Sequence, residues 1–535
     1  MSGLVTPSQI GAKASYSSPA VPPTAWRAFE RRNPATKVIG LFLSMSLGLI
    51  VAIYPSSAGI ALAAGSVLLL VLIQANRMEI ETWQTISLIA LTGYVVLNYG
   101  FENLSVPVGP LRFIPVGELL MGAALTLAVL RYRGPVFRDA SRDPSIICVL
   151  ALLALTLLHL ALDLPEYGLY ALRDGTSSFE ALFLLLGILW AARERNIELL
   201  TKWLMFLFIV TMAYSYTFPW AERLQDWSLI SGPFHSVSLL GNYQDLAVYL
   251  VSGALFCIWV APTVGKWPSW LLGMLAIAQL AGLGLLQSRT MYVGIALVLV
   301  LLFFLRETKR ASQFLSMLAS GLGALALTIL LLSAVGWKVQ GRLGPVDMSS
   351  LRNEVRSIWP SSAESHELGH EADRRAWYGE VWNKLCSSPS HLLLGVGYGQ
   401  PLIDFMSETG QPIRQPHNSS LNVFGRLGLL GLSIWLLFIS EVLKRLWNGV
   451  REARKRGAVS CPLRLWLLAF SVLGLLDSMV QPYFEFSHSA VPFYFLVGVA
   501  LGINPKEDTK RATLPRGMRL SLRAPERHAL RRLPW

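Results

Sequence analysis

Charged residues are scarce in this chain. Asp, Glu, Lys and Arg make up 15% of its 535 residues, while 53% are hydrophobic. A soluble domain has about 25% charged residues, so the shortage argues against an ordinary soluble protein. The apolar residues form long runs such as "LFLSMSLGLIVAIY" and "IALVLVLLFFL". Because a bilayer-spanning helix needs roughly 20 mostly apolar residues, these runs predict a membrane protein.

Cysteines are also few. They are Cys148, Cys257, Cys386 and Cys461, and no two of them have the CxxC spacing of a redox or zinc site. Only Cys386 falls in the one long hydrophilic stretch of the chain. A disulfide framework on the exported side is therefore not expected.

No sequence feature indicates a nucleic-acid partner, although the formal net charge is +13. The basic residues form no basic–aromatic recognition module. They gather in short segments between apolar runs, where Lys and Arg contact anionic lipid head groups. We therefore expect inner-membrane lipids, and no nucleic acid, as partners of this charge.

The apolar runs predict an all-α fold, a polytopic transmembrane helix bundle of about 12–14 helices with one long extracytoplasmic loop. The predicted spans are 37–54, 57–75, 83–100, 114–131, 145–163, 179–192, 200–217, 240–260, 268–287, 290–305, 315–336, 419–443, 465–482 and 489–503.

Lys and Arg are distributed unevenly between the two sides of this bundle. With the N-terminus inside, 32 of the 46 Lys and Arg residues lie in inner segments, and the short outer loops hold only Arg112, Arg173, Arg223 and Arg289. Positive residues concentrate on the cytoplasmic side of membrane proteins. The sequence therefore predicts that both termini are cytoplasmic and that the long loop, 337–416, is periplasmic.

This topology divides the chain into five parts. We expect a disordered cytoplasmic tail over 1–36, transmembrane helices over 37–336, the extracytoplasmic loop over 337–416, transmembrane helices over 417–503, and a basic cytoplasmic tail over 504–535. The Pro- and Ser-rich composition of the first part is typical of disorder.

Two stretches of the long loop have recognisable patterns. "DRRAWYGEVWNKLCSSP" predicts an amphipathic helix that ends before Pro389, because Trp377, Val381, Trp382 and Leu385 fall near helical spacing. We expect this helix on the membrane surface, with its tryptophans at headgroup level. The glycine-rich "LLLGVGYGQPL" lacks the context of a dinucleotide fingerprint and predicts a turn back to the membrane.

One motif of the loop, "HELGH" from His366 to His370, fits the H-E-x-x-H pattern of zinc peptidases. Its flanks are polar, and Asp373 and Ala376 stand where the extended pattern has Gly and His. A solvated pair of loop histidines is the expected interpretation. A zinc membrane peptidase remains an alternative.

Two outer-face arginines are candidates for binding an anion. Arg289 lies in "LLQSRTMYVG", between two apolar runs, and Arg173 lies in "YGLYALRDGTSSFE" beside Asp174. A snorkelling Arg289 and an exposed local Arg173–Asp174 pair are the plain interpretations. However, the planar guanidinium fork matches phosphate oxygens, so both suit a lipid-linked diphosphate at that depth.

A polar cluster, "RQPHNSS", leads into the predicted helix that starts near Ser419. Asn418 or Ser419 can cap that helix. Capping does not explain His417, whose side chain accepts protons near neutral pH. In the following "GRLGLLG", Arg426 is unexpected and needs a partner or an inward face.

Three stretches together resemble the O-antigen ligase and polymerase superfamily of bacterial polysaccharide membrane proteins. They are "QSRTMYVGIALVLVLLFF", the loop "RRAWYGEVWNKL…LLLGVGYGQ", and "PHNSSLNVFGRLGLLGLSIWLLF"; "YALRDG" and "GNYQDLA" are looser matches. The resemblance covers roughly 85–503. Members of the family often have Glu where Arg426 stands.

The resemblance implies a membrane glycosyltransferase of surface polysaccharide synthesis, either O-antigen (lipopolysaccharide) or exopolysaccharide. Such an enzyme transfers glycan from an undecaprenyl-diphosphate carrier to a glycan or lipid-core acceptor at the outer face of the inner membrane, with inversion and with no cofactor or metal. It implies catalytic roles for His417, as base, and Arg289, and substrate binding by Arg173, Arg289 and Asn418. A chain-length regulator is a candidate protein partner.

Other classes remain open at this point. A polytopic transporter or lipid flippase would share the helix count, but it has no need for a long outer loop with a histidine at its end. Within the family, polymerase and ligase are not separated by any residue of the sequence.

Overall fold

The computed structural model describes most of the chain from residue 81 to residue 503. The described residues are 81–104, 115–132, 134–216, 230–231, 236–237, 246–264, 267–335, 340–341, 344–346, 370–406, 412–458 and 460–503. They all belong to one compact unit, Arg77–Trp535. The predicted tails 1–36 and 504–535, and the first two predicted spans, lie outside the described residues.

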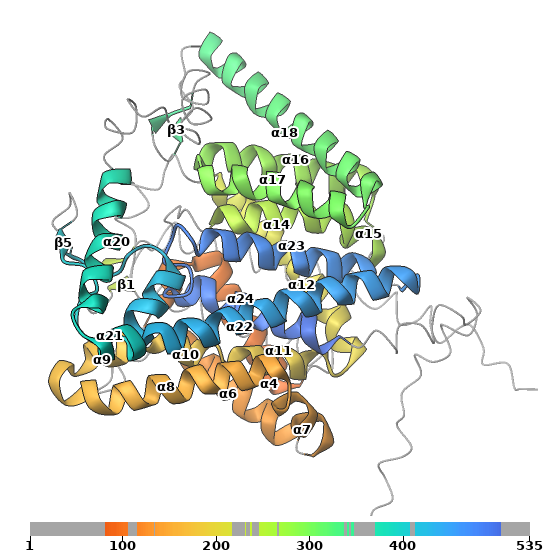
Figure 1. Ribbon diagram of the computed structural model, residues 1–535. Coiled ribbons are helices and arrows are strands. Elements are labelled where there is room, and N and C mark those ends of the chain that lie inside the picture. Colours follow the sequence, from red (N-terminus) through yellow and green to blue (C-terminus); the bar gives the residue numbers. More distant parts are fainter. Residues whose placement is uncertain are drawn as a thin grey trace, which may run out of the picture. The chain divides into compact units, whose positions relative to one another are not determined.

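The first half of the unit is a succession of helices (Figure 1). These are α4 (Thr82–Thr92), the π-helix η1 (Gly93–Leu97), α5 (Tyr99–Glu102), α6 (Val116–Arg131), α7 (Pro135–Ser141), α8 (Pro144–Tyr167), α9 (Leu169–Asp174), α10 (Thr176–Glu180), α11 (Phe183–Ala191), α12 (Glu194–Ser215), α14 (Leu246–Trp259) and α15 (Ala261–Val264).

Helices also dominate the second half. They are α16 (Ser269–Leu286), α17 (Arg289–Phe304), α18 (Thr308–Ala334), α20 (His370–Cys386), α21 (Pro389–Leu394), α22 (Ser419–Lys455), α23 (Cys461–Asp477) and α24 (Ser487–Gly502). The described strands are two-residue pieces in three hairpins: β1 (Ile230–Ser231) with β2 (Ser236–Val237), β3 (Gln340–Gly341) with β4 (Gly344–Pro345), and β5 (Phe405–Met406) with β6 (Pro412–Ile413).

The predicted all-α polytopic fold is confirmed. Every predicted span from 83–100 onward overlaps a helix or a run of short helices. Among the described residues, five helices are long and apolar enough to cross a membrane: Pro144–Tyr167, Arg195–Ala213, Ser269–Leu286, Thr308–Ala334 and Ser419–Lys455. The other apolar helices are shorter, because several are interrupted, as at Asn98 (φ 49°) between η1 and α5.

Helices in the middle of the unit are buried, and outer ones expose apolar side chains. α22 packs on α8 and α23, and α11 packs on α24 (Figure 1). In contrast, α18 exposes Leu322, Leu327, Leu330 and Leu331. A continuous exposed apolar face of this kind is typical of a helix in contact with lipid.

The predicted helix of the long loop forms as α20, and α21 begins at Pro389. The apolar face of α20 does not face the membrane, however, because it packs within the protein. Trp377, Val381 and Leu385 are buried in a small core of their own with Leu402, Ile403 and Phe424. Of the two tryptophans only Trp382 is exposed. The predicted helical spacing is thus confirmed, but these apolar residues pack against residues 402–403 of the following loop and against α22 instead of the membrane.

Candidate functional site

A break in α22 receives the glycine-rich loop that the sequence predicts as a turn. Gly428 has φ 62°, inside the helix. At this break the N–H of Val396 donates to the carbonyl of Gly425 (2.9 Å), and the N–H of Gly397 to that of Arg426 (3.1 Å). A Cβ at Gly395 would lie 2.2 Å from the carbonyl oxygen of Arg426. Glycine is therefore required for this close approach.

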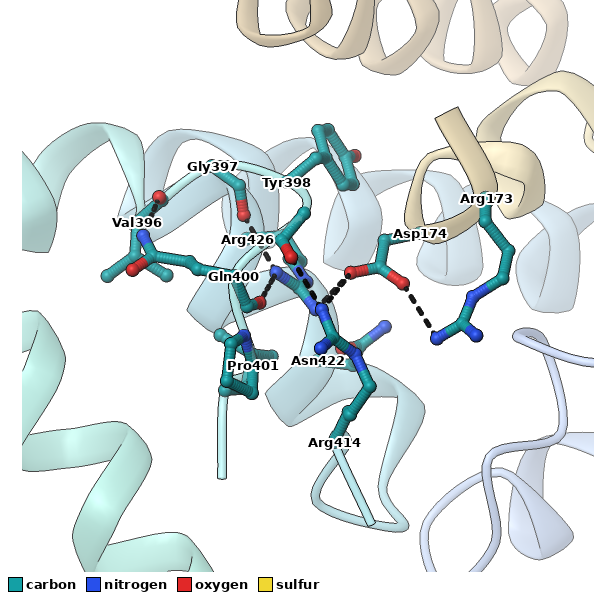
Figure 2. Close-up of polar contacts among 12 residues, drawn as sticks. Arg173, Asp174, Val396, Gly397, Tyr398, Gln400, Pro401, Arg414, Asn422 and Arg426 are labelled. Atoms are coloured by element: carbon teal, nitrogen blue, oxygen red, sulfur yellow. Dashed lines mark hydrogen bonds and ion pairs between the residues drawn. The ribbon is translucent and has the colours of Figure 1, made fainter. Parts of the chain in front are cut away.

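Arg426 holds the same loop from inside. Its guanidinium donates to the carbonyls of Gly397 (3.1 Å) and Gln400 (2.6 Å) and lies 2.9 Å from the carboxylate of Asp174 (Figure 2). Its side chain is only 1% exposed. The sequence requires a partner for this arginine, and the partner is Asp174. A buried charge needs such a set of contacts, because removal from water is otherwise too costly.

Asp174 is shared by two further arginines. Arg173 lies 3.3 Å and Arg414 3.6 Å from its carboxylate oxygens (Figure 2), and the Asp174 side chain is fully buried. The expected exposed local pair is therefore wrong in one respect: Asp174 is the buried centre of a cluster. We call Arg173, Asp174, Arg414 and Arg426 the arginine cluster.

The arginine cluster carries more positive than negative charge, since three guanidinium groups surround one carboxylate. The Arg426 guanidinium is engaged in contacts within the protein. Arg173 keeps 49% of its side chain exposed, and the Arg173 and Arg414 guanidinium groups lie 5.6 and 5.0 Å from the centre of the Tyr170 ring. An exposed guanidinium with one edge still available is suited to an anionic oxygen ligand such as a phosphate.

Glu485, between α23 and α24, is a second carboxylate, partly buried next to the start of α22. Its oxygens accept from Ser419 Oγ (2.6 Å) and Asn422 Nδ2 (2.8 Å). Burial raises the pKa of Glu485 to about 7, against the opposing effect of these two hydrogen bonds and of the Arg426 charge. Glu485 thus changes charge near neutral pH.

A cavity of about 30 Å³ connects the arginine cluster with Glu485. Asp174, Arg426, Asn422 and Glu485 are among its lining residues. Since one water molecule needs roughly 10–15 Å³ of such space, the cavity has room for about two waters and none for a sugar. The rest of its lining is largely apolar, so it is a small space of mixed polarity behind the arginine cluster.

His417 stands directly before α22 in an unusual backbone conformation, with φ 37°. A positive φ at a residue other than glycine is held only by surrounding structure and is common at functional sites. The imidazole lies edge-on against the Trp377 ring, with centroids 5.2 Å apart. α20 of the long loop and the start of α22 therefore meet at this histidine.

Asn418 caps α22, in agreement with one of the two capping residues that the sequence allows. Its side-chain oxygen accepts from the N–H of Leu421 (2.9 Å), and its amide donates to the carbonyl of Met479 (2.9 Å). The N–H of Ser419 also donates to the carbonyl of Ser478 (2.8 Å). Both ends of the Asn418 amide thus have structural partners, and its role in substrate binding stays a prediction.

Arg289 is the first residue of α17 and is partly buried. A Cβ on Gly294 of that helix would lie 2.7 Å from a side-chain carbon of Leu473 and 3.5 Å from one of Leu476, so α17 packs on the C-terminal half of α23. Met479, just beyond α23, contacts the Asn418 cap. This packing favours a shared site for Arg289 and His417, but their proximity stays a prediction.

The zinc motif cannot be placed in space. His366 lies outside the described residues, and only the backbone of His370 is described, at the start of α20. Within the described part of the chain, no group of three His, Cys, Asp or Glu side chains could hold a metal ion.

Three site residues are absent from the sequence-based set: Asp174, Arg414 and Glu485. Asp174 was visible only as the neighbour of Arg173, and Arg414 only as the start of "RQPHNSS". Glu485 lies between Phe484 and Phe486, and a carboxylate flanked by aromatics is a weak pointer to burial. The contacts that define their roles join distant segments.

Comparison with known proteins identifies the region that contains most of this site. Residues 272–436 match the family model described as O-antigen ligase. The match includes Arg289, His417, Asn418, Arg426 and the glycine-rich loop, whereas α9 and Glu485 lie outside it. No curated protein matches the chain. Residues 272–436 thus form a region of the O-antigen ligase family, a membrane glycosyltransferase type, within a multi-pass membrane protein.

Proposed function

We propose that this protein transfers glycan from an undecaprenyl-diphosphate carrier to a glycan or lipid-core acceptor at the outer face of the inner membrane. Membership of the O-antigen ligase family implies lipid-linked glycan substrates. The observation that carries the proposal is the arginine cluster, in which positive charge exceeds negative charge and Arg173 is half exposed. Arg414 of this cluster lies three positions before the candidate base, His417.

The proposed reaction is an inverting displacement. An acceptor hydroxyl attacks the anomeric carbon of the lipid-linked sugar, the new C–O bond forms, and the bond from that carbon to the diphosphate oxygen breaks. His417 takes the hydroxyl proton, an effect typically of about 10²–10⁴-fold on rate. Arg289 and Arg173 stabilise the negative charge that develops on the leaving diphosphate.

In the proposed site, some residues hold the structure in place and others are exposed to substrate. Arg426 and Asp174 are buried and fix the loop against α22, whereas Arg173 remains half exposed to meet substrate. Trp377 and the Asn418 cap fix the ring and the backbone on either side of His417. Preorganised groups of this kind need no rearrangement when charge develops, which is where electrostatic catalysis gains its strength.

His417→Ala tests this proposal. We expect the variant to reach the membrane at the wild-type level and to melt within a few degrees of wild type, but to form no glycan product in a cell or membrane assay. The matched control is His391→Ala in α21, whose ring contacts only the exposed Ser387 hydroxyl among the contacts described (2.9 Å), and which should transfer normally. Wild-type transfer by His417→Ala would exclude His417 as the base.

A further inference from the structure

Glu485 takes no part in the mechanism proposed above, yet it is partly buried against the helix turn that follows His417. It belongs to the connection between α23 and α24 and reaches across to α22. Ser419, two residues after His417, donates to one of its oxygens, and Asn422, five residues after, donates to the other. The N–H of Phe484 in turn donates to Ser419 Oγ (3.2 Å).

These contacts bear on His417 because its backbone needs external support. The positive φ of His417 is a strained conformation for a non-glycine residue. The first turn of α22 follows at once, so whatever fixes that turn also fixes where the imidazole points. Ser419 is fully buried and Asn422 nearly so, and both are anchored to the same carboxylate.

The charged and titratable groups that face Glu485 come from four elements. Arg426 of α22 and Asp174 of α9 line the same cavity, together with Tyr398 of the glycine-rich loop and Tyr494 of α24. Arg426 is the only cation among them, and it is already paired with Asp174. Glu485 therefore has no ion-pair partner of its own in this group and depends on neutral donors.

Two residues that line this cavity have a side-chain polar atom without a hydrogen-bond partner among the described residues. Asn422 Oδ1 and Arg426 Nε are buried and have no hydrogen-bond partner among the described residues. Both residues line the cavity of about 30 Å³. Water there would satisfy an acceptor and a donor at once. It would also give Glu485 a route for proton exchange.

We infer that Glu485 is a positioning residue for His417, holding the first turn of α22 in place only while its carboxylate is ionised. This inference rests on the proposed function of His417. The ionised carboxylate accepts from both donors. When it is protonated, the oxygen that carries the proton becomes a donor. Either the Asn422 amide must then turn its Oδ1 toward Glu485, or the Ser419 hydroxyl must stop donating to Glu485 and accept from it, so one of the two present contacts is lost.

The pH dependence of transfer tests the inference. Two groups, His417 and Glu485, must then lose a proton for activity, so the log of the initial rate should fall below pH 7 with a slope of about two. In Glu485→Gln the slope should drop to about one, with the rate at pH 8 lowered about tenfold by a misplaced base. Glu485→Asp keeps a titrating group and should keep the steeper slope.

A matched control separates positioning from general destabilisation. Asp143 caps α8, accepts from the N–H of Ser145 (2.9 Å) and pairs with Arg445 near the other end of α22. Asp143→Asn should leave the slope at the wild-type value. If Glu485→Gln does not fold, Ser419→Ala supplies the test: loss of that donor should shift the steep limb to higher pH. An unmoved limb would contradict the inference.

Thermal unfolding tests the protonation of Glu485 without any substrate, through its effect on stability. A carboxyl whose folded pKa is raised contributes stability that is present below its ordinary pKa and is lost as pH rises through the folded value. The melting temperature of wild type should therefore fall between pH 4.5 and about 7 relative to that of Glu485→Gln.

Transfer by His417→Ala would overturn the proposed function and the positioning role together. An unchanged slope in Glu485→Gln, with His417→Ala inactive, would overturn the positioning role alone.

Discussion

Arg426 illustrates how one residue can be indispensable without touching substrate. Its guanidinium binds a carboxylate and two carbonyls at once, from inside the protein. Only a planar fork with several donors can do this, and a lysine cannot replace it because an ammonium is a single point charge. In this chain, then, the task of this arginine is to fasten the loop that leads to the site.

The energetics of this pair can be tested in detergent by thermal or denaturant unfolding. Arg426→Met leaves Asp174 buried with only its weaker partners, and we expect a loss of about 3–5 kcal/mol in unfolding free energy. Adding Asp174→Asn should recover part of that loss. The exposed pair of Lys202 and Glu198 (2.9 Å) is the control, since Lys202→Met should change stability by less than about 1 kcal/mol. Equal losses at the two sites would contradict this account.

At the scale of elements, helix packing depends on a few places where no side chain fits. α11 and α24 approach so closely that a Cβ on Gly187 would lie 2.0 Å from the carbonyl oxygen of Phe495, and one on Gly498 would lie 2.1 Å from that of Leu184. Small residues at such crossings are typical of membrane helices, which associate by close packing. This crossing holds the second half of α24 against α11.

Gly187→Ala should therefore force the two backbones apart. We expect a loss of about 1–3 kcal/mol in unfolding free energy, the usual cost of overpacking. Gly122→Ala in α6 is the matched control, because a Cβ there meets nothing within 4 Å. That substitution should be neutral or stabilising by up to about 1 kcal/mol through helix propensity. A stable Gly187→Ala would mean that the crossing has room to spare.

For the whole molecule, the decisive question is which side of the membrane the site faces. The described cysteines provide a probe that needs no new substitution: Cys386 at the end of α20 is exposed, while Cys148, Cys257 and Cys461 are buried. We expect a membrane-impermeant maleimide to label intact spheroplasts at Cys386 and Cys386→Ser to abolish the label. Labelling that requires lysis would place the loop in the cytoplasm and exclude the proposed reaction at the outer face.

The sequence by itself determined the class of molecule, the positions of the long apolar helices, and the resemblance to the O-antigen ligase family that the match over 272–436 bears out. It did so because apolar run length and Lys and Arg placement are local properties that a bilayer selects directly. It also predicted a catalytic role for His417, and both that role and the placement of His417 beside Arg289 remain predictions.

Only the tertiary structure decided what surrounds those residues. Asp174 and Arg426 are 252 positions apart, and Ser419 and Glu485 are 66 apart, yet each pair is in direct contact. Hydropathy and motif spacing carry no information on such contacts. They arise where a broken helix, a glycine loop and a helix connection meet, since buried polar groups in a membrane protein must find their partners within the protein.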